Sequence, residues 1–367
     1  MLKKLQFNGR ALVRVLMPAL GVIALISAPG CNLLRGNKVK TAALPARVKT
    51  NTVAPIDLTK SQPNEAGKIP IIMYHDLVDK QAAHGLQYPC SQFRKDIEWL
   101  YAHKYRPIGL SDFVNGRIDC PEGMSPVILT FDDAVKGQFR ILPDGKTDPN
   151  CVVGILEDFH AKHPDWQLRG TFFVLTDADP RFPPPFYQKE FAQGKLEQLV
   201  KDGFEVGNHT VHHKSMNRLS DAQATAEIAG AVAGIHKYLP DYDVNELALP
   251  YGRYPKNLSV VKSGTSNGIS YKNIVALKAA WRPVSSPMAR GFNPYMLERI
   301  TPGDKFQQSY WWLNYLEKNK SEKFIRDGDP NTYTVNSMSV GLLDKQKILK
   351  NHYHIRTYRD GKVISTT

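Results

Sequence analysis

Apolar and polar positions follow two different periods along residues 69–303 of this 367-residue chain. Short apolar runs bounded by polar or turn residues predict strands, and longer segments with apolar positions three or four apart predict amphipathic helices. Runs typical of strands lie at residues 69–74, 126–131, 170–175, 204–207, 246–249 and 273–278. Helical patterns fill several of the gaps, at residues 91–105, about 149–162, about 187–202 and 220–238.

Strands that are interleaved with helices predict a parallel sheet with helices outside it. We therefore expect an α/β domain over residues 69–303. The carboxyl ends of parallel strands lie on one side of such a domain, which is where a barrel of this kind carries its active site. The polar motifs described below follow strands in this way.

The pattern changes after about residue 304. Aromatic residues at 309–313 begin a predicted helix, residues 327–330 (Asp-Gly-Asp-Pro) predict a turn, and residues 333–340 and 352–358 predict strands. The aromatic rings could line a groove for a sugar chain, but packing against the preceding domain is the favoured interpretation. We expect residues 304–367 to form a C-terminal extension packed on the barrel.

The first residues form a predicted export signal. Positive charges precede an apolar stretch over residues 15–27, which is too short to span a membrane comfortably. Residues 28–31 (Ala-Pro-Gly-Cys) are similar to the lipobox of bacterial lipoproteins, in which the cysteine becomes the lipidated N-terminus. We expect residues 1–31 to direct export, with a lipid-anchored Cys31 favoured over a secreted protein or a retained anchor.

Most of the net charge of +13 lies outside the predicted barrel. Residues 1–68 carry 11 Lys/Arg and 2 Asp/Glu, whereas the remaining residues carry 37 and 33. Residues 32–68 are basic and lack periodicity, so we expect a flexible tether. Charge concentrated in a tether, with no nucleic-acid motif, argues against a nucleic-acid partner.

Three cysteines, Cys90, Cys120 and Cys151, lie in the predicted barrel. Export permits one disulfide among them, but the sequence does not choose a pair, and a buried free thiol is as plausible for each. The lack of any Cys-x-x-Cys spacing argues against a zinc ion held by cysteines.

Two acidic and two basic positions form the main chemical signal. Asp132 and Asp133 follow the strand at 126–131, and alternation along a strand would point these adjacent carboxylates in different directions, leaving one for a metal and one as a base. His209 and His213 are four residues apart, so one helical turn would place both imidazoles on one side. Two histidines and one carboxylate leave an open position, as in a hydrolytic zinc site.

These motifs resemble those of the polysaccharide deacetylases with NodB homology, carbohydrate esterase family 4. Residues 130–133 match the family's T-F-D-D, residues 209–213 match H-[S/T]-x-x-H, and residues 249–252 (Leu-Pro-Tyr-Gly) match the end of R-x-P-Y. The resemblance covers roughly residues 68–303. It implies a distorted (β/α) barrel, often with fewer than eight repeats.

The resemblance also implies roles for individual residues. Asp133, His209 and His213 would be metal ligands, most simply for zinc, although the same ligand set suits other divalent ions. Asp132 would be the base, and the backbone N–H of Tyr251 would help to hold the oxyanion. His212 is the alternative ligand, because it also lies about one turn from His209.

Two family features are displaced in this chain. The arginine of R-x-P-Y, which orients the catalytic aspartate, corresponds to Ala248, so Arg299 is the candidate replacement and Arg253 its rival. The family's late L-x-H motif carries the general-acid histidine. We find no strand with this motif between residues 273 and 303.

The strand at residues 71–76 has the same form as that late motif, since it ends in His75 and an aspartate. The first and last strands of a closed barrel are neighbours, so His75 could occupy the position of the late histidine as the general acid. A role in binding substrate, in supporting the metal ligands or in structure alone remains open for it.

The expected function is metal-dependent removal of N-acetyl groups from an extracellular or cell-envelope polysaccharide. Peptidoglycan, poly-N-acetylglucosamine and chitin-type oligomers all remain possible substrates, and an O-acetyl esterase is the nearest enzymatic alternative. A glycan-binding lipoprotein of the same fold with little or no turnover is the alternative from another class. The displaced arginine and acid keep that alternative open.

Overall fold

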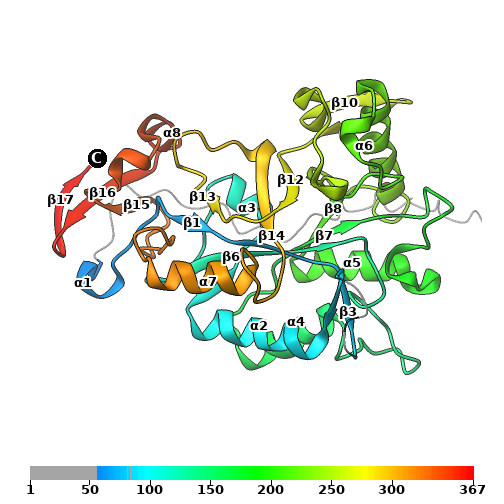
Figure 1. Cartoon of the computed structure of the whole chain (residues 1–367), viewed down its shortest axis with the longest axis horizontal. Coiled ribbons are helices and arrows are strands. Elements are labelled where there is room, and N and C mark those ends of the chain that lie inside the picture. Colours follow the sequence, from blue (N-terminus) through cyan, green and yellow to red (C-terminus); the bar gives the residue numbers. More distant parts are fainter. Residues whose placement is uncertain (1–55, 81, 83–84) are drawn as a thin grey trace, which may run out of the picture. The chain divides into compact units, whose positions relative to one another are not determined.

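The computed structural model describes residues 56–80, 82 and 85–367 (Figure 1). The expected export signal at residues 1–31, its Cys31, and residues 32–55 of the expected tether lie outside these described residues. Within the described part of the chain, no helix is both long enough and apolar enough to cross a membrane.

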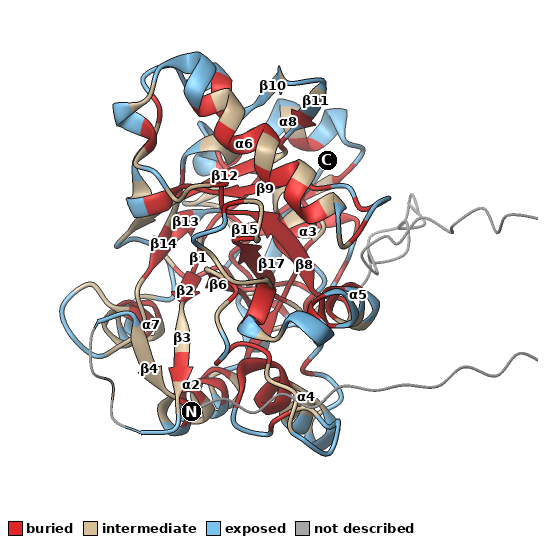
Figure 2. Ribbon diagram, turned by 90° about the vertical axis from the view of Figure 1, so that its right-hand side faces the viewer, coloured by how far each residue is buried: buried red, intermediate tan, exposed pale blue. Residues whose placement is uncertain are grey.

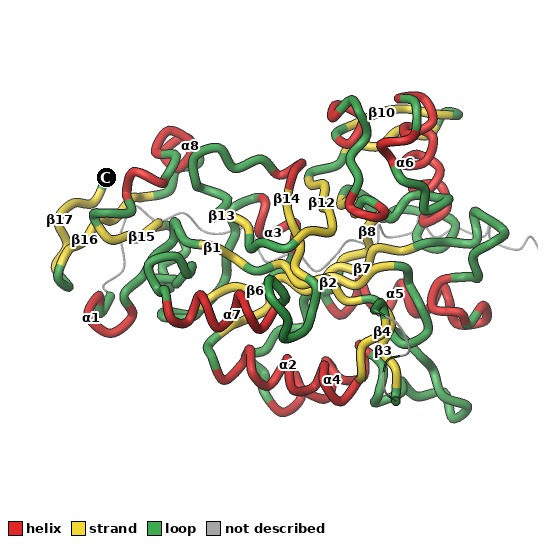
Figure 3. The backbone as a smooth tube through the Cα atoms, in the orientation of Figure 1, coloured by secondary structure: helices red, strands yellow, loops and turns green. Residues whose placement is uncertain are grey.

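Seven parallel strands close into a barrel, which confirms the predicted α/β barrel fold (Figures 1 and 3). Around the barrel the order is β2, β14, β12, β9, β8, β7, β6 and again β2. A further strand, β5 (Tyr105–Pro107), pairs with the first residues of β6. The seven strands are β2 (Ile71–Tyr74), β6 (Ser125–Asp132), β7 (Thr171–Val174), β8 (Glu205–Asn208), β9 (Glu246–Ala248), β12 (Val275–Ala280) and β14 (Leu297–Ile300).

The barrel strands are apolar because both of their faces are covered. All eight residues of β6 are buried, and Figure 2 shows the barrel strands as mostly buried ribbon. Leu129 and Phe131 of β6 belong to the apolar cluster that includes the surrounding helices, whereas Ile128 belongs with Phe173 to the cluster inside the barrel. Alternation along β6 thus supplies an outer and an inner core.

Four of the surrounding helices were predicted; their limits lie within three residues of the predicted ones, except that the helix predicted from about residue 187 begins at Ala192, and the short helix at Leu110–Val114 was not predicted. Ser220 caps the longest of them and forms a reciprocal capping box with Gln223. The helix expected to reach Tyr105 ends at Ala102, because Tyr105 enters strand β5. The helices are α2 (Cys90–Ala102), α3 (Leu110–Val114), α4 (Val152–Lys162), α5 (Ala192–Asp202) and α6 (Asp221–His236).

The sequence pattern missed several short strands, of which β14 matters most. It pairs with β12 and β2 and so closes the barrel between them. Its central residues are Glu298 and Arg299, so it has no apolar run to reveal it. Strands β5 and β17 (Lys362–Thr366) were missed as well. Further missed strands form small pairs: β1 (Lys68–Ile69) with β13 (Val284–Ser285), β3 (Asp76–Val78) with β4 (Gln87–Pro89), and β10 (Ser263–Ser266) with β11 (Ile269–Lys272).

The C-terminal extension packs on the barrel through α7 (Ser309–Lys318). The hydroxyl of Tyr310 donates a hydrogen bond to Asp96 of α2 at 2.9 Å, and its ring lies 5.8 Å from that of Trp99. A three-stranded sheet follows, made of β15 (Thr332–Asn336), β16 (His354–Arg359) and β17 (Lys362–Thr366), with α8 (Lys345–Lys350) beside it. The strand predicted to reach residue 340 is therefore too long by four residues.

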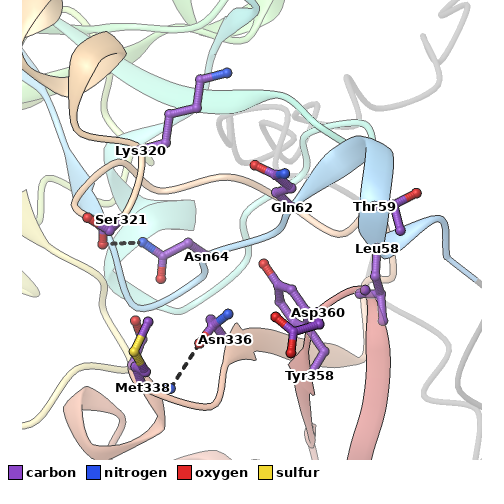
Figure 4. Close-up of a pocket in the computed structure, with 12 residues that line it drawn as sticks. Leu58, Thr59, Gln62, Asn64, Lys320, Ser321, Asn336, Met338, Tyr358 and Asp360 are labelled. Atoms are coloured by element: carbon purple, nitrogen blue, oxygen red, sulfur yellow. Dashed lines mark hydrogen bonds between the residues drawn. The ribbon is translucent and has the colours of Figure 1, made fainter.

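The tether prediction is wrong for its last residues. Residues 58–61 form a short helix, α1 (Leu58–Ser61), and the buried carboxylate of Glu65 is paired with the buried guanidinium of Arg326. A hollow of about 450 Å³ lies between this segment and the C-terminal extension (Figure 4), where the side-chain amide of Asn64 donates to the carbonyl of Ser321 at 2.9 Å. Residues 58–68 therefore belong to the folded unit.

Cys90, Cys120 and Cys151 are buried, and each has a free thiol. The disulfide that the sequence permitted does not form among these three residues.

Candidate active site

The candidate residues meet at the carboxyl ends of the barrel strands. His75 follows β2, Asp132 is the last residue of β6, His209 follows β8 and Arg299 lies in β14. Tyr251 lies in the 3-10 turn η4 (Pro250–Gly252), three residues beyond the end of β9. Parallel strands bring together these residues, which are up to 224 positions apart in the sequence.

Asp132 is held by Arg299 through two parallel hydrogen bonds. The guanidinium donates to Oδ1 at 2.6 Å and to Oδ2 at 2.7 Å, and both side chains are buried. Burial by itself would raise the pKa of Asp132, but Arg299 and then His209 outweigh it and hold the pKa well below its ordinary value. Asp132 is therefore an oriented, ionised carboxylate.

Arg299 thus takes the place expected of the family's displaced arginine. It reaches Asp132 from β14, whereas Ala248, the position that corresponds to the motif arginine, lies on β9. The rival Arg253 is exposed and lines a groove beside the site instead.

Asp133 faces the same space as Asp132, contrary to the expectation that adjacent carboxylates would diverge. The strand ends at Asp132, and Asp133 adopts a left-handed backbone with φ of 78°. This turn brings Asp133 Oδ1 to 3.3 Å from His209 Nε2, while Asp132 Oδ2 lies 3.8 Å from the same nitrogen. The alternation rule fails because it holds only within regular strand backbone.

His209 and His213 converge without a helix, so the predicted helical turn is wrong. They lie in the irregular segment after β8, where Thr210 and His213 have φ of 66° and 48°. The two rings are 4.9 Å apart between centroids. Asn208 Oδ1 accepts a hydrogen bond from the Thr210 N–H at 2.8 Å and supports this sharp turn.

Left-handed backbone is uncommon in residues other than glycine, and it recurs around this site. Asp133, Thr210, His213 and Tyr251 all have positive φ. Such conformations cost free energy, on the order of 1–3 kcal/mol each, and they cluster where side chains must be aimed at a common point. The strain here is consistent with a functional arrangement.

Asp133, His209 and His213 offer one ligand atom each, and the three atoms lie within 4.8 Å of one another. His209 Nδ1 contacts the carbonyl of Ala248 at 2.9 Å and must donate to it, so Nε2 presents a lone pair. That lone pair faces Asp133 Oδ1, a buried atom with no hydrogen-bond partner. Either a proton on Nε2 or a metal ion would relieve this facing pair of acceptors, and the donor set of two histidines and one carboxylate fits a divalent metal.

Burial and neighbouring ionisable groups shift the pKa values of His209 and His213 in opposite directions. Burial disfavours charge on His209, but Asp132 and Asp133 outweigh it and raise the pKa of His209. Burial and the neighbouring His209 lower the pKa of His213 to about 4. His213 is therefore neutral at physiological pH, which is the form that binds metals.

His212, the alternative ligand, turns away from this group. Its Nδ1 lies 2.8 Å from Glu227 Oε1, and its backbone N–H donates to the other oxygen of Glu227 at 2.8 Å. The geometry therefore favours His213 over His212 as the partner of His209.

His75 lies beside Asp132, with 3.9 Å between His75 Nε2 and Asp132 Oδ2. Its strand, β2, pairs with both β6 and β14, so the first and last barrel strands are neighbours as expected. Burial lowers the pKa of His75, although Asp132 opposes this shift. The lowered pKa favours the neutral ring, which releases a proton easily once it has received one.

Tyr251 forms the rim of the site. Its side chain is 65% exposed, and its ring lies 4.8 Å from that of His213. The next residue, Gly252, has φ of 63°, and a Cβ there would come within 2.6 Å of the Ala279 carbonyl oxygen. Only glycine permits β12 to approach this turn so closely.

Two residues near the site were missed by sequence reasoning. Gln138 is fully buried, and its amide donates to the carbonyls of both His75 and Asp132, so it ties the ends of β2 and β6 together. Tyr187 lies close enough to Asp133 for that carboxylate to contribute, after burial, to raising the pKa of Tyr187. Gln138 lies in a turn and Tyr187 ends the short 3-10 helix η1 (Pro185–Tyr187), and no sequence pattern identified either of them.

Comparison with known proteins gives a family for part of the chain. Residues 121–270 match the sequence model of a family described as polysaccharide deacetylase. The Bacillus subtilis (strain 168) protein YxkH, whose name assigns it to the polysaccharide deacetylases, is 19% identical over 240 residues, which cover 64% of this chain and 72% of YxkH.

Solved structures show weaker likeness. The Streptococcus pyogenes deacetylase PplD, in complex with acetate, has a TM-score of 0.48 and 18% identity, and the match covers 64% of this chain and 92% of PplD. A de-N-acetylase from Aggregatibacter actinomycetemcomitans has a TM-score of 0.44 and 12% identity over 65% of this chain and 97% of that protein.

Proposed function

We propose that this chain, which matches the polysaccharide deacetylase family model over residues 121–270, removes N-acetyl groups from an extracellular or cell-envelope polysaccharide with a bound divalent metal. The observation that carries this proposal is the cluster of Asp133, His209 and His213 beside the clamped Asp132. Zinc is the metal that two histidines and one carboxylate favour most simply.

When bound by these three residues, the metal would acidify a water molecule and polarise the acetyl carbonyl. Asp132 accepts the proton of the attacking water. Its low pKa keeps it ionised and so able to accept a proton, and Arg299 fixes its direction. Tyr251, at the rim, is placed to contribute its backbone N–H to the oxyanion.

His75 completes the reaction by protonating the departing amine. An amine leaves poorly as an anion, so its nitrogen must receive a proton as the C–N bond breaks. His75 Nε2, 3.9 Å from Asp132 Oδ2, is near the carboxylate that takes the proton from water. We assign to His75 the transfer of a proton from this region to the nitrogen.

The geometry argues against the alternative of a glycan-binding protein with little or no turnover. That alternative was kept open because the motif arginine and the general-acid histidine are missing from their usual positions in the sequence. Arg299 now contacts Asp132 on both oxygens, and His75 lies at the same carboxylate. Both observations favour turnover.

The direct test is acetate release by the metal-loaded full-length protein. Peptidoglycan fragments and N-acetylglucosamine oligomers are supplied separately, with Asp132→Asn in parallel. We expect acetate from at least one substrate with the wild type and a rate at least 100-fold lower with Asp132→Asn. Equal glycan binding by both proteins without acetate from either would contradict the proposal.

We also propose that the protein is exported and anchored at a lipidated Cys31, with N-acetylated polysaccharide as its partner outside the cytoplasm. The support is the N-terminal charge pattern and the residues before Cys31. Fractionation tests this location, because Cys31→Ala should move the protein from the membrane fraction to the soluble one.

A further inference from the structure

A groove of about 650 Å³ opens beside the candidate active site, and His213 and Tyr251 form part of its wall. Its other walls come from the loops that follow β7, β8 and β9. A sugar chain whose acetyl group reaches His213 and Tyr251 would therefore extend into this groove.

The groove is cationic. Four of its lining residues carry a positive charge, and none of the described lining residues is acidic. The four are Arg181, Lys214, Arg218 and Arg253. Residues 69–367 as a whole are nearly balanced, with 37 Lys/Arg and 33 Asp/Glu, so this excess is a local property.

Two of the four charges are balanced by carboxylates beneath the surface. Arg181 Nε lies 2.9 Å from Asp179 Oδ2, and Lys214 Nζ lies 3.3 Å from Glu227 Oε1. Asp179 and Glu227 are only 3% and 5% exposed, so these buried carboxylates offset the charges of Arg181 and Lys214.

Arg218 and Arg253 have no such carboxylate among the described residues. Both are exposed, and the hydrogen bonds recorded for each use its backbone rather than its guanidinium. Two guanidinium groups in one concave wall favour carboxylate or phosphate oxygens, which they bind with paired N–H donors. A concave surface also concentrates the field of such charges.

We propose that the substrate is an anionic polysaccharide, in which carboxylate or phosphate groups on sugars beside the N-acetylated residue contact Arg218 and Arg253. This inference rests on the proposed deacetylase function. It also fits the charge of the product, because each acetyl group removed leaves an ammonium group. A chain of N-acetylglucosamine alone would become polycationic and be repelled by the groove.

The test uses matched oligosaccharides and the metal-loaded full-length protein. One oligosaccharide alternates N-acetylglucosamine with a carboxylate-bearing sugar, a second carries phosphodiesters, and a third is the carboxyl-reduced form of the first. We expect the wild type to have a kcat/KM about 10-fold higher on a charged form than on the reduced one, at low salt. The better charged form identifies the anion.

Arg218→Gln/Arg253→Gln should bring that ratio to about 1, chiefly through KM, because the anion loses its partners. Lys362→Gln, an exposed cation on β17, is the control and should leave the ratio unchanged. An equal kcat/KM on charged and reduced forms in the wild type, or a ratio that survives the double substitution, overturns the inference.

Failure of the proposed function gives a different result. If no oligosaccharide releases acetate, the deacetylase proposal fails, and calorimetric binding by Asp132→Asn still tests the groove. Tighter binding of a charged form than of the reduced form supports the inference, and equal binding overturns it.

Discussion

Arg299 and Asp132 form a buried, two-pronged ion pair across the barrel, with hydrogen bonds of 2.6 and 2.7 Å. Arg299 is fully buried, so solvent does not weaken the pair. The arginine also lies 5.4 Å above the ring of Phe173, which restricts its movement. The orientation of the Asp132 carboxylate therefore depends on a residue of the last barrel strand.

Arg299→Lys should lower kcat for acetate release at least 100-fold, because an ammonium group cannot hold both oxygens of Asp132 and small misplacements of a catalytic group are costly. Steady-state kinetics on the best N-acetylated substrate measures this. Arg282→Gln is the control, since Arg282 binds Glu298 at the surface and should retain activity. If Arg299→Lys kept the kcat of the wild type, Arg299 would not be needed to orient Asp132.

Arg299→Met should also destabilise the fold by about 3–5 kcal/mol, because it leaves Asp132 charged and unpaired in the interior. Urea unfolding of the metal-free protein measures the loss. Adding Asp132→Asn to Arg299→Met should recover much of it, since the orphaned charge is then removed. A double variant as unstable as the single one would show that the pair is not the cause.

His75→Gln separates proton donation from other roles. We expect kcat on an N-acetylated glycan to fall about 100-fold or more, because an amine must be protonated to leave. Hydrolysis of p-nitrophenyl acetate should fall less than about 3-fold, because its phenolate leaves without a proton. An equal loss on both substrates would instead indicate a role in supporting the metal ligands, and no loss on either would indicate a structural histidine.

The sequence predicted the barrel and the meeting of the motifs better than it predicted their geometry. The apolar run before Asp132 is long and unambiguous, so the strand and its polar end were both recognised. Strand β14 was missed because Glu298 and Arg299 occupy its centre, and the reason for that polarity, a charged partner inside the barrel, is visible only in three dimensions.

Backbone conformation limited the prediction of the site itself. The spacing of His209 and His213 identified a pair that converges, but a helical turn was the wrong reason. Asp133, Thr210 and His213 adopt positive φ. A glycine in the sequence would have suggested this conformation, but these residue types do not predict it. Contacts between distant segments, such as Gln138 bridging His75 and Asp132, have no signal in a single sequence.

Metal binding should depend on three residues and not on their neighbour. Calorimetric titration of zinc into chelator-treated protein should show affinity lowered at least about 100-fold in Asp133→Asn, His209→Gln and His213→Gln, because each removes one of three ligands. His212→Gln should bind zinc as the wild type does, since His212 contacts Glu227 instead. Weak binding by His212→Gln with tight binding by His213→Gln would reverse the assignment.

Chelation should also stop catalysis. Acetate release by the wild type should fall to background after dialysis against a chelator and return when zinc or another divalent ion is added. The ion that restores the highest kcat identifies the preferred metal. Full activity in protein shown to be free of metal by elemental analysis would contradict metal dependence.

Two buried glutamates, Glu205 and Glu246, lie at the amino end of the barrel, and replacing each by neutral glutamine should change the free energy of unfolding in opposite directions. Glu205 accepts hydrogen bonds from the backbone N–H groups of Leu110 and Ser111 at 2.8 and 2.9 Å and from Thr171. Glu205→Gln should therefore lower the free energy of unfolding by about 1–3 kcal/mol.

For Glu246, burial and then the nearby Glu205 raise the pKa well above its ordinary value of 4.5.

The raised pKa of Glu246 fixes the sign of its pH effect. Above pH 4.5 the unfolded chain releases this proton while the folded protein retains it, so the contribution of Glu246 to stability declines as pH rises. Glutamine does not titrate, so Glu246→Gln should unfold at higher urea concentration than the wild type at pH 8, with the difference shrinking toward pH 4.5. Urea unfolding at both pH values measures this. A variant less stable than the wild type at pH 8 would mean that Glu246 is ionised and stabilised in the folded barrel.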